Sequence, residues 1–294
     1  MARRPFITAL VAPLALLVIA CSSNASGAGG GGGQGGHGGA APTDPPDVAD
    51  AIAACYATLH GDVSGRADAL AKLEAATTNH PDNGRAHLFF GMCSLAALAE
   101  DGDLGALADI EPALSRAIEL MPEDRRIPGW LATVRVQTAR ILGDTAKIEQ
   151  ATAEMIAAAD LYPEFNNVSL AIAFAGFPLD TPYPAMAVKR LEAIASCGDV
   201  DEKCRDNAAA PHNVPGSSML FGDVYARVGD KARASTFYSA ALASPSAATW
   251  GLKDAAKASL DGLDQRVAAW TDADATNDPE FFLAGKRTCT ACHQ

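Results

Sequence analysis

Basic residues are scarce in this sequence. Its 294 residues include 23 lysines and arginines against 35 aspartates and glutamates, which gives a formal net charge of −12 at pH 7. An acidic surface repels the phosphate backbone of DNA and RNA, so we expect no binding to nucleic acid.

Aromatic residues make up only 6% of the chain, and polar and apolar residues rarely alternate as they do in β-strands. The motifs of common enzyme sites, G-x-S-x-G, H-E-x-x-H, the P-loop and the dinucleotide-binding glycine pattern, are also missing. These absences favour an all-α protein and predict that it is not an enzyme.

A continuous apolar run is present only near the start of the chain. Arg3 and Arg4 precede an apolar run that extends from about residue 6 to Ala20 and is interrupted by Pro13. The run is too short for a comfortable transmembrane helix and is typical of a signal peptide over residues 1–20.

The end of this run, "VIAC", resembles the lipobox of bacterial lipoproteins. The resemblance implies cleavage before Cys21, acylation of Cys21, and a location in the bacterial cell envelope, anchored to a membrane by lipid and facing the periplasm or the exterior. An ordinary cleaved signal with an incidental cysteine is the alternative. Arg3, Arg4, Phe6 and Ile7 also resemble a twin-arginine export signal, for which a plain charged start is the alternative.

Residues 21–46 follow as a linker rich in glycine and proline. A Gly-rich chain of this length behaves as a coil with a root-mean-square span of roughly 25–30 Å. We therefore expect a folded part, which begins near Asp47, to be tethered at some distance from the membrane.

The chain has seven cysteines, and an odd number is unusual outside the cytoplasm. If Cys21 carries lipid, six remain. Cys197 and Cys204 flank a polar loop, and Cys55 and Cys93 lie about one repeat apart, so we expect each of these two pairs to form a disulfide in an oxidising compartment. The last two cysteines are Cys289 and Cys292.

The middle of the chain repeats with a period of 41 residues. The markers are prolines at positions 81, 122, 163 and 245, which are separated by one, one and two periods. Before each of the first three prolines, apolar residues recur with spacings of four and three. They are Ala69, Leu73 and Ala76; Ile110, Leu114 and Ala117; and Ala151, Met155 and Ala158. This spacing places them on one face of a helix, which the proline then ends.

The last unit resembles the tetratricopeptide repeat in residue type and spacing. The matching residues are Phe221, Gly222, Tyr225, Gly229, Ala234, Tyr238 and Ala241. Phe90, Gly91 and Trp130 occupy related places in earlier units, although the period exceeds the 34 residues of that family.

The resemblance implies a right-handed superhelical solenoid of five helical hairpins over residues 47–244, with a groove that binds a protein partner, a peptide or a small ligand. Residues 245–288 are expected to cap it with a longer amphipathic helix that turns near Gly262.

The C-terminal segment, residues 289–294, contains Cys289-x-x-Cys292-His293, which resembles the haem-attachment motif of c-type cytochromes. The resemblance implies thioether bonds from both cysteines to haem c and His293 as an axial ligand of the iron. A disulfide or free dithiol and a metal site are the alternatives.

Because only Gln294 follows the motif, we expect any sixth iron ligand within this chain to come from earlier in the sequence; an open coordination site or a ligand from a partner chain is the alternative. The candidates are Met219, Met186, Met121, His212, His87, His80 and His60. The sequence thus predicts an envelope lipoprotein whose helical scaffold binds a partner and whose end carries haem, as an electron-transfer or haem-bearing component. A partner- or ligand-binding scaffold without haem, with Cys289 and Cys292 joined in a disulfide, is the alternative.

Overall fold

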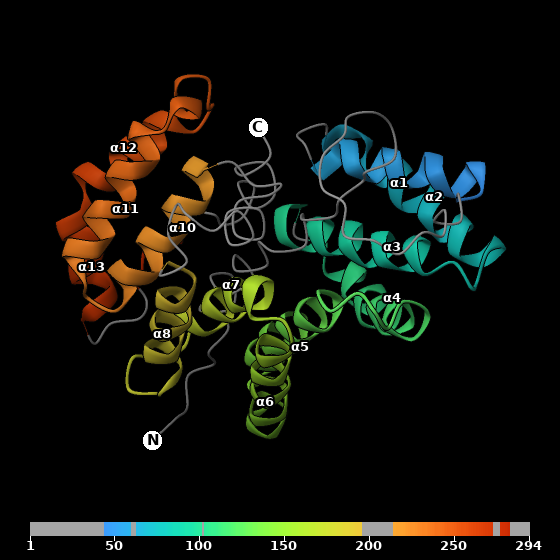
Figure 1. Ribbon diagram of the computed structural model, residues 1–294, viewed down its shortest axis with the longest axis horizontal. Helices are drawn as coiled ribbons and strands as arrows, with labels where there is room; N and C mark the ends of the chain where they lie inside the picture. The colour runs from blue at the N-terminus through green and yellow to red at the C-terminus, as the bar shows by residue number, and fades with distance from the viewer. Residues whose placement is uncertain (1–43, 60–62, 102, 196–213, 273–276, 283–294) are drawn as a thin grey trace, which may run out of the picture.

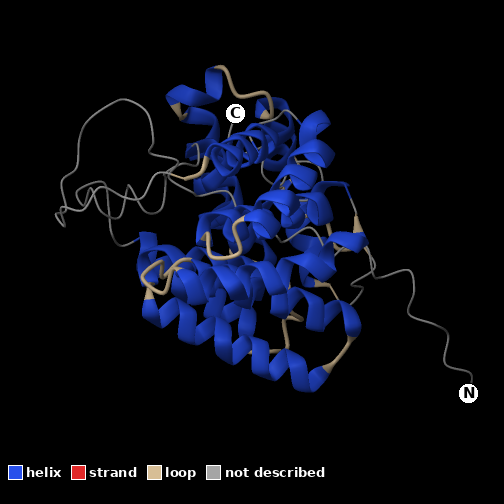
Figure 2. Ribbon diagram, turned by 90° about the vertical axis from the view of Figure 1, so that its right-hand side faces the viewer, coloured by secondary structure: helices blue, strands red, loops and turns tan. Residues whose placement is uncertain are grey.

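The computed structural model describes residues 44–59, 63–101, 103–195, 214–272 and 277–282. These residues form twelve α-helices and, within the described ranges, no strand (Figure 2). The helices are α1 (Pro46–Leu59), α2 (Arg66–Asn79), α3 (Gly84–Ala96), α4 (Leu107–Leu120), α5 (Ile127–Leu142), α6 (Thr145–Leu161), α7 (Pro163–Ala175), α8 (Tyr183–Ala195), α10 (Val214–Arg227), α11 (Lys231–Ala243), α12 (Lys253–Asp261) and α13 (Leu263–Thr271).

The helices from α1 to α11 pack as sequential pairs, each helix mainly against its partner in the pair, whereas α13 packs mainly against α10. The pairs α1/α2, α3/α4, α5/α6, α7/α8 and α10/α11 confirm the five predicted hairpins and are consistent with helical hairpin repeats. In Figure 1 they follow one another along an arc, from α1 and α2 through α5 and α6 to α11–α13. None of the described helices combines the length and the apolar character needed to cross a membrane.

The repeated apolar residues lie on the second helix of each of the first three pairs. On α2, Leu73 is fully buried, as are Leu114 on α4 and Met155 on α6. The small residues flanking them are at most 5% exposed, so each helix presents one apolar face to its neighbours. The periodicity read from the sequence therefore identifies the core correctly.

The marker prolines end these helices by a common geometry. The residue before each of the first three is His80, Met121 or Tyr162, with φ of −128°, −132° and −144° and ψ of 65°, 60° and 76°. The ring of a following proline excludes the helical conformation at these residues. Each of the three donates its N–H to the carbonyl of the repeated alanine four residues earlier, Ala76, Ala117 or Ala158, which closes the last turn.

The units reach the same period in different ways. The pair α5/α6 has helices of 16 and 17 residues joined by a tight turn, in which Gly143 adopts a left-handed conformation with φ of 64°. The pair α3/α4 has helices of 13 and 14 residues and a longer connection that contains a short π-helical segment and a 3-10 turn. The extra length over a 34-residue repeat thus lies in the helices of one unit and in the connection of another.

Two glycines on the first helices let the paired helix approach closely. A Cβ on Gly222 of α10 would collide with the ring of Tyr238 on α11, and a Cβ on Gly91 of α3 would lie 2.8 Å from Leu114 Cδ2 on α4. The aromatic–glycine dipeptides noted in the sequence therefore mark contacts within a hairpin.

The chain beyond Pro245 differs in part from the prediction. A 3-10 turn (Pro245–Ala248) precedes α12 and α13, which are two nine-residue helices separated at Gly262. The predicted turn near Gly262 is confirmed, but it divides the expected longer helix into two.

Candidate functional site

Most of the residues with predicted chemical roles lie outside the described residues. These residues are Cys21, Cys197, Cys204, Cys289, Cys292 and His293, together with the candidate iron ligands His60 and His212. The last described residue is Phe282, seven positions before Cys289. The part of the structure that bears most directly on the predicted haem site is therefore the last described stretch, residues 277–282.

Two phenylalanines anchor residues 277–282 to the last helices. Phe281 and Phe282 are 8% and 1% exposed. The ring of Phe282 lies 5.6 Å from that of Trp250, and the ring of Phe281 lies 5.3 Å from that of Trp270 on α13. Burial of two aromatic side chains of this size fixes the segment firmly, since each contributes roughly 1.5–3 kcal/mol.

The side chain of Asp223 on α10 binds the backbone of residues 277–282. Its fully buried carboxylate accepts a hydrogen bond from the N–H of Phe282 and another from the hydroxyl of Tyr238. Nη2 of Arg266 donates a third at 3.0 Å. Asp223 follows Gly222 directly, and the missing side chain of that glycine is what admits the Tyr238 ring.

The pKa values within this cluster show how burial and charge compete. Burial raises the pKa of the Asp223 carboxyl, and although the Arg266 guanidinium and the Phe282 N–H oppose this, the pKa stays above its ordinary value. Burial, followed by the nearby Asp223 carboxylate, also raises the pKa of the Tyr238 hydroxyl. The hydroxyl therefore stays protonated and keeps its role as a donor.

Two arginines complete the attachment by binding backbone carbonyls. Arg266 donates to the carbonyl of Glu280 at 3.0 Å, and its guanidinium lies 4.6 Å from the ring centre of Trp270. Arg227, at the end of α10, donates to the carbonyl of Trp270 and lies 3.5 Å from the Asp278 carboxylate.

The indole Nε1 of Trp270 donates to the carbonyl of Pro279 at 2.9 Å. We call Asp223, Arg227, Tyr238, Arg266 and Trp270 the clasp, because together they hold residues 278–282.

The clasp is not apparent from the sequence, from which we predict only a capping role for residues 245–288. One signal was present: Asp223 stands among apolar residues in "LFGDVYARVG", where a buried carboxylate needs donors from elsewhere. The donors come from positions 15, 43 and 59 residues later, and a single sequence does not reveal such pairings.

The described candidates for the sixth iron ligand are spread over the molecule. His80 Nε2 lies 2.9 Å from the Asp47 carboxylate, and His87 Nε2 lies 3.0 Å from the carbonyl of Pro81; both histidines belong to the first two helical pairs. Met121 and Met186 are partly buried in the core. Met219, fully buried, is the one described candidate on a helix of the clasp, one turn before Asp223. Among the described residues, no group of three or more histidine, cysteine or acidic side chains could hold a metal ion.

Cys55 and Cys93, the pair predicted to form a disulfide, lie on two helices that contact each other. Both side chains are fully buried, on α1 and α3. Cys55 donates to the carbonyl of Phe89 at 3.7 Å, and the Cys93 sulfur lies 3.7 Å from the Thr58 hydroxyl. The structure therefore places the expected pair on adjacent helices, and the disulfide between them stays a prediction.

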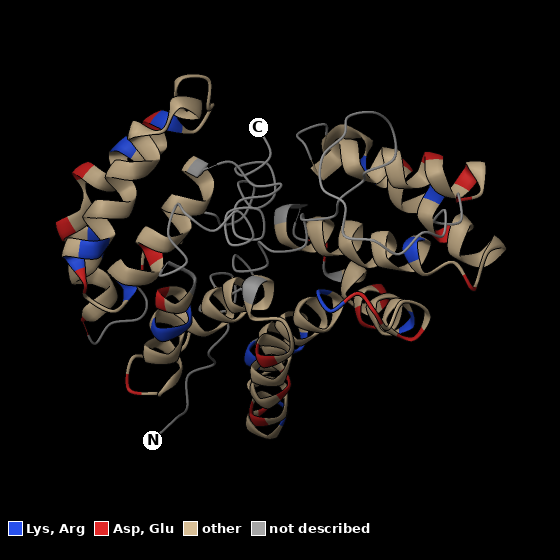
Figure 3. Cartoon of the chain, viewed as in Figure 1, with Lys and Arg blue, Asp and Glu red and all other residues tan. Residues whose placement is uncertain are grey.

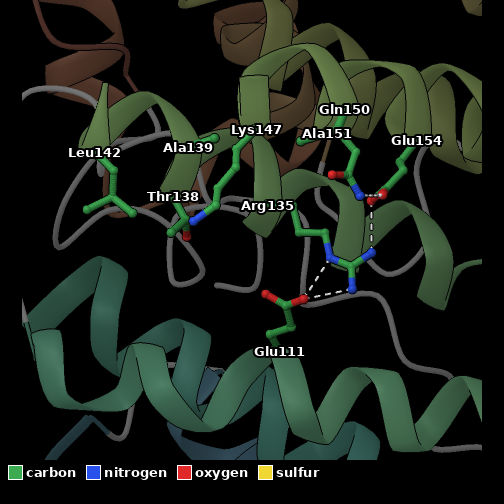
Figure 4. A pocket seen from close by; sticks show the side chains of 9 residues that line it. All are labelled: Glu111, Arg135, Thr138, Ala139, Leu142, Lys147, Gln150, Ala151 and Glu154. Carbon is green, nitrogen blue, oxygen red and sulfur yellow. Dashed lines mark hydrogen bonds and ion pairs between the residues drawn. The ribbon is translucent and has the colours of Figure 1, made fainter. Parts of the chain in front are cut away.

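A cavity of about 260 Å³ lies where α4, α5 and α6 meet. Figure 4 shows Arg135 extended between Glu111 and Glu154 at this cavity. The guanidinium donates to Glu111 at 2.9 and 2.7 Å and to Glu154 at 2.8 Å, and Gln150 donates to the other oxygen of Glu154 at 2.8 Å. Burial lowers the pKa of Arg135, but the two carboxylates outweigh it and raise the pKa overall. These contacts between one guanidinium and two carboxylates tie α4, α5 and α6 together.

Comparison of the chain with protein-family models, with curated proteins and with solved structures gave no match.

Proposed function

We propose that this protein is a lipid-anchored component of the bacterial cell envelope that carries one covalent haem c at its C-terminus and binds a partner protein through its helical repeats. The observation that carries the proposal is the spacing of Cys289, Cys292 and His293. Two thiols for the vinyl groups of haem and one imidazole for the iron are the donor set that this attachment requires.

The structure supports this proposal through the clasp. Phe282 is fixed to α10 by Asp223, and the chain between Phe282 and Cys289 can extend at most about 25 Å. The clasp therefore keeps Cys289 within about 25 Å of Phe282 and Cys292 within about 35 Å. Bound haem would supply one-electron transfer, and His293 would bind its iron.

For the scaffold we propose a right-handed superhelical solenoid of the tetratricopeptide type, with a groove for a partner. Support comes from the five sequential pairs and from the contacts between one pair and the next, α2 with α3, α4 with α5 and α6 with α7. The three matching helix ends, at His80, Met121 and Tyr162, also favour equivalent turns along the chain.

The haem proposal is tested by producing the full chain in a bacterial host that matures c-type cytochromes. We expect a Soret band and peroxidase staining of the band on a denaturing gel. Cys289→Ser together with Cys292→Ser abolishes both signals, whereas His293→Ala keeps the covalent haem and changes its spectrum. Absence of haem from the wild-type chain, with an intact mass that shows only the loss of hydrogens, would instead support the scaffold with a Cys289–Cys292 disulfide.

The anchor is tested separately. The wild-type protein is expected in the membrane fraction, released by detergent and not by salt, since acyl chains and not charges hold it. Cys21→Ser moves the protein to the soluble fraction or leaves its signal peptide uncleaved. An unchanged membrane association of a processed Cys21→Ser protein contradicts lipidation at this residue.

A further inference from the structure

A polar groove lies between α2 and α4, over one side of α3. It consists of two adjoining cavities of about 360 and 340 Å³, which share Phe90 and Asp109. The residues that matter for its chemistry are Glu74, Phe90, Ser94, Asp103, Asp109 and Arg116. We call this surface the α2/α4 groove. Acidic residues occur on all the helical pairs (Figure 3), so the groove is distinguished by what its acids contact and not by their number.

No described residue neutralises the acids of the α2/α4 groove. The carboxylates of Glu74 on α2 and Asp109 on α4 are exposed, and neither forms an ion pair with a described residue. From the described residues, the Asp103 carboxylate accepts only the N–H of Gly105, at 2.9 Å.

The one arginine at the groove does not supply the missing positive charge. Arg116 is bound by Asp82 at 2.7 Å and by Glu119 at 2.8 Å. The opposed walls of the first cavity thus keep an excess of negative charge.

The floor of the groove contains the aromatic ring of Phe90 and the hydroxyl of Ser94. Phe90 is half-buried, lines both cavities, and has no ring or cation packed on it among the described residues. Ser94, one turn further along α3, is 1% exposed and lines the first cavity. Its hydroxyl forms no hydrogen bond with another described residue. A hydroxyl that lines a cavity in this way can bond to a polar group supplied by a ligand.

We propose that the α2/α4 groove binds a basic segment of a partner protein. A lysine or arginine side chain enters the first cavity, its alkyl stem lies on Phe90, and its charged end lies between Glu74 and Asp109. Cations are attracted to the face of an aromatic ring as well as to carboxylates, so the floor and the walls favour the same group. This proposal names a partner chemistry and does not depend on haem.

The two adjoining cavities favour a peptide over a small cation. In an extended chain, side chains two residues apart point to the same side, about 7 Å from each other. An extended segment can therefore fill both cavities at once, whereas a single ammonium ion occupies one. The acidic charge of the whole chain, −12, also speeds the approach of a basic partner.

The test uses the full-length protein and a fluorescein-labelled peptide of alternating lysine and glycine, with fluorescence anisotropy as the readout. We expect saturable binding that weakens with salt. Glu74→Gln with Asp109→Asn should weaken it on the order of tenfold, because each exposed ion pair contributes about a factor of two to five. Ser94→Ala and Phe90→Leu, which keep the helix intact, should each weaken it about twofold or more.

The matched control is Glu123→Gln with Asp180→Asn, two exposed acids outside the groove that change the net charge equally. This variant should bind like the wild type. Equal losses in both double variants would show that only diffuse charge attracts the peptide and would overturn the proposal. Spermidine that binds as tightly as the peptide would overturn it in favour of a small polyamine. Circular dichroism and the unfolding midpoint of each variant separate loss of binding from loss of fold.

Discussion

The N–H of Phe282 donates a hydrogen bond to the carboxylate of Asp223, which stands 59 residues earlier in the chain. Asp223 lies within α10, fully buried, and Phe282 is the last described residue. The backbone N–H of Phe282 thus helps to satisfy the buried carboxylate of Asp223, which α10 alone could not satisfy. The carboxylate holds the segment, and the segment in turn supplies one of the three donors that make the buried charge tolerable.

Replacing this carboxylate should be costly. Asp223→Asn removes the negative charge that pairs with Arg266, and its amide NH₂ faces hydrogen-bond donors instead of acceptors. We therefore expect the free energy of unfolding to fall by about 3–5 kcal/mol. Urea denaturation measures the loss, and hydrogen exchange at the Phe282 amide should become fast. Asp264→Asn, at an exposed residue that pairs with Lys231, serves as the control and should change stability by less than about 1 kcal/mol. Similar losses in both variants would contradict the special role of Asp223.

The two close helix approaches should respond differently to an added methyl group. Gly222→Ala pushes against the ring of Tyr238, whose hydroxyl is held by Asp223, and we expect it to lower the unfolding free energy by about 1–3 kcal/mol. Gly91→Ala meets the end of Leu114, a flexible side chain that can rotate away, so its effect should be smaller. Thermal unfolding of the two variants decides the order; a larger loss for Gly91→Ala would contradict it.

Acid should weaken the start of α11. Asp230 caps this helix, and the N–H of Arg233, together with its guanidinium, lowers the pKa of the Asp230 carboxyl below its ordinary value. A lowered pKa in the folded state means that the stabilisation is complete above the ordinary value near pH 4 and is lost as the pH falls through the folded value. Asp230→Asn keeps a capping oxygen but not the charge. We expect the difference in unfolding midpoint between the wild type and this variant to be constant from pH 7 to 5 and to shrink below pH 4; a difference that grows on acidification would contradict the assignment.

The state of Cys55 and Cys93 is open to direct measurement. Because both side chains are fully buried, we expect neither to react with iodoacetamide in the folded protein, whichever state they are in. Labelling of both after unfolding without reductant would show that they are thiols. Peptide mapping by mass spectrometry separates them from the other cysteines. Labelling of this pair only after reduction would show that the disulfide expected from the sequence does form, with α1 and α3 joined by it.

The sequence predicted the repeated part of the fold well because that part depends on local pattern. A buried leucine such as Leu73 and a helix-ending proline such as Pro81 recur with a fixed period, and each acts within its own helix or on its neighbour. The clasp could not be predicted in the same way. Tyr238, Arg266 and Phe282 meet Asp223 only after three helices have packed, and nothing in their local sequence specifies that partner. The predicted haem-attachment residues lie beyond the described chain, and the clasp locates only the point from which they extend.

The common backbone geometry at His80, Met121 and Tyr162 has a consequence for the length of the protein. A chain that leaves each unit in the same conformation, with a proline next, can be cut after one such residue and rejoined after another without changing its direction at the junction. Removal of residues 81–121 would join His80 to Pro122 and bring the end of α2 to the start of α5. Gain or loss of a whole 41-residue unit is thus a small step for this architecture, and it would move the clasp relative to the linker while leaving each of them intact.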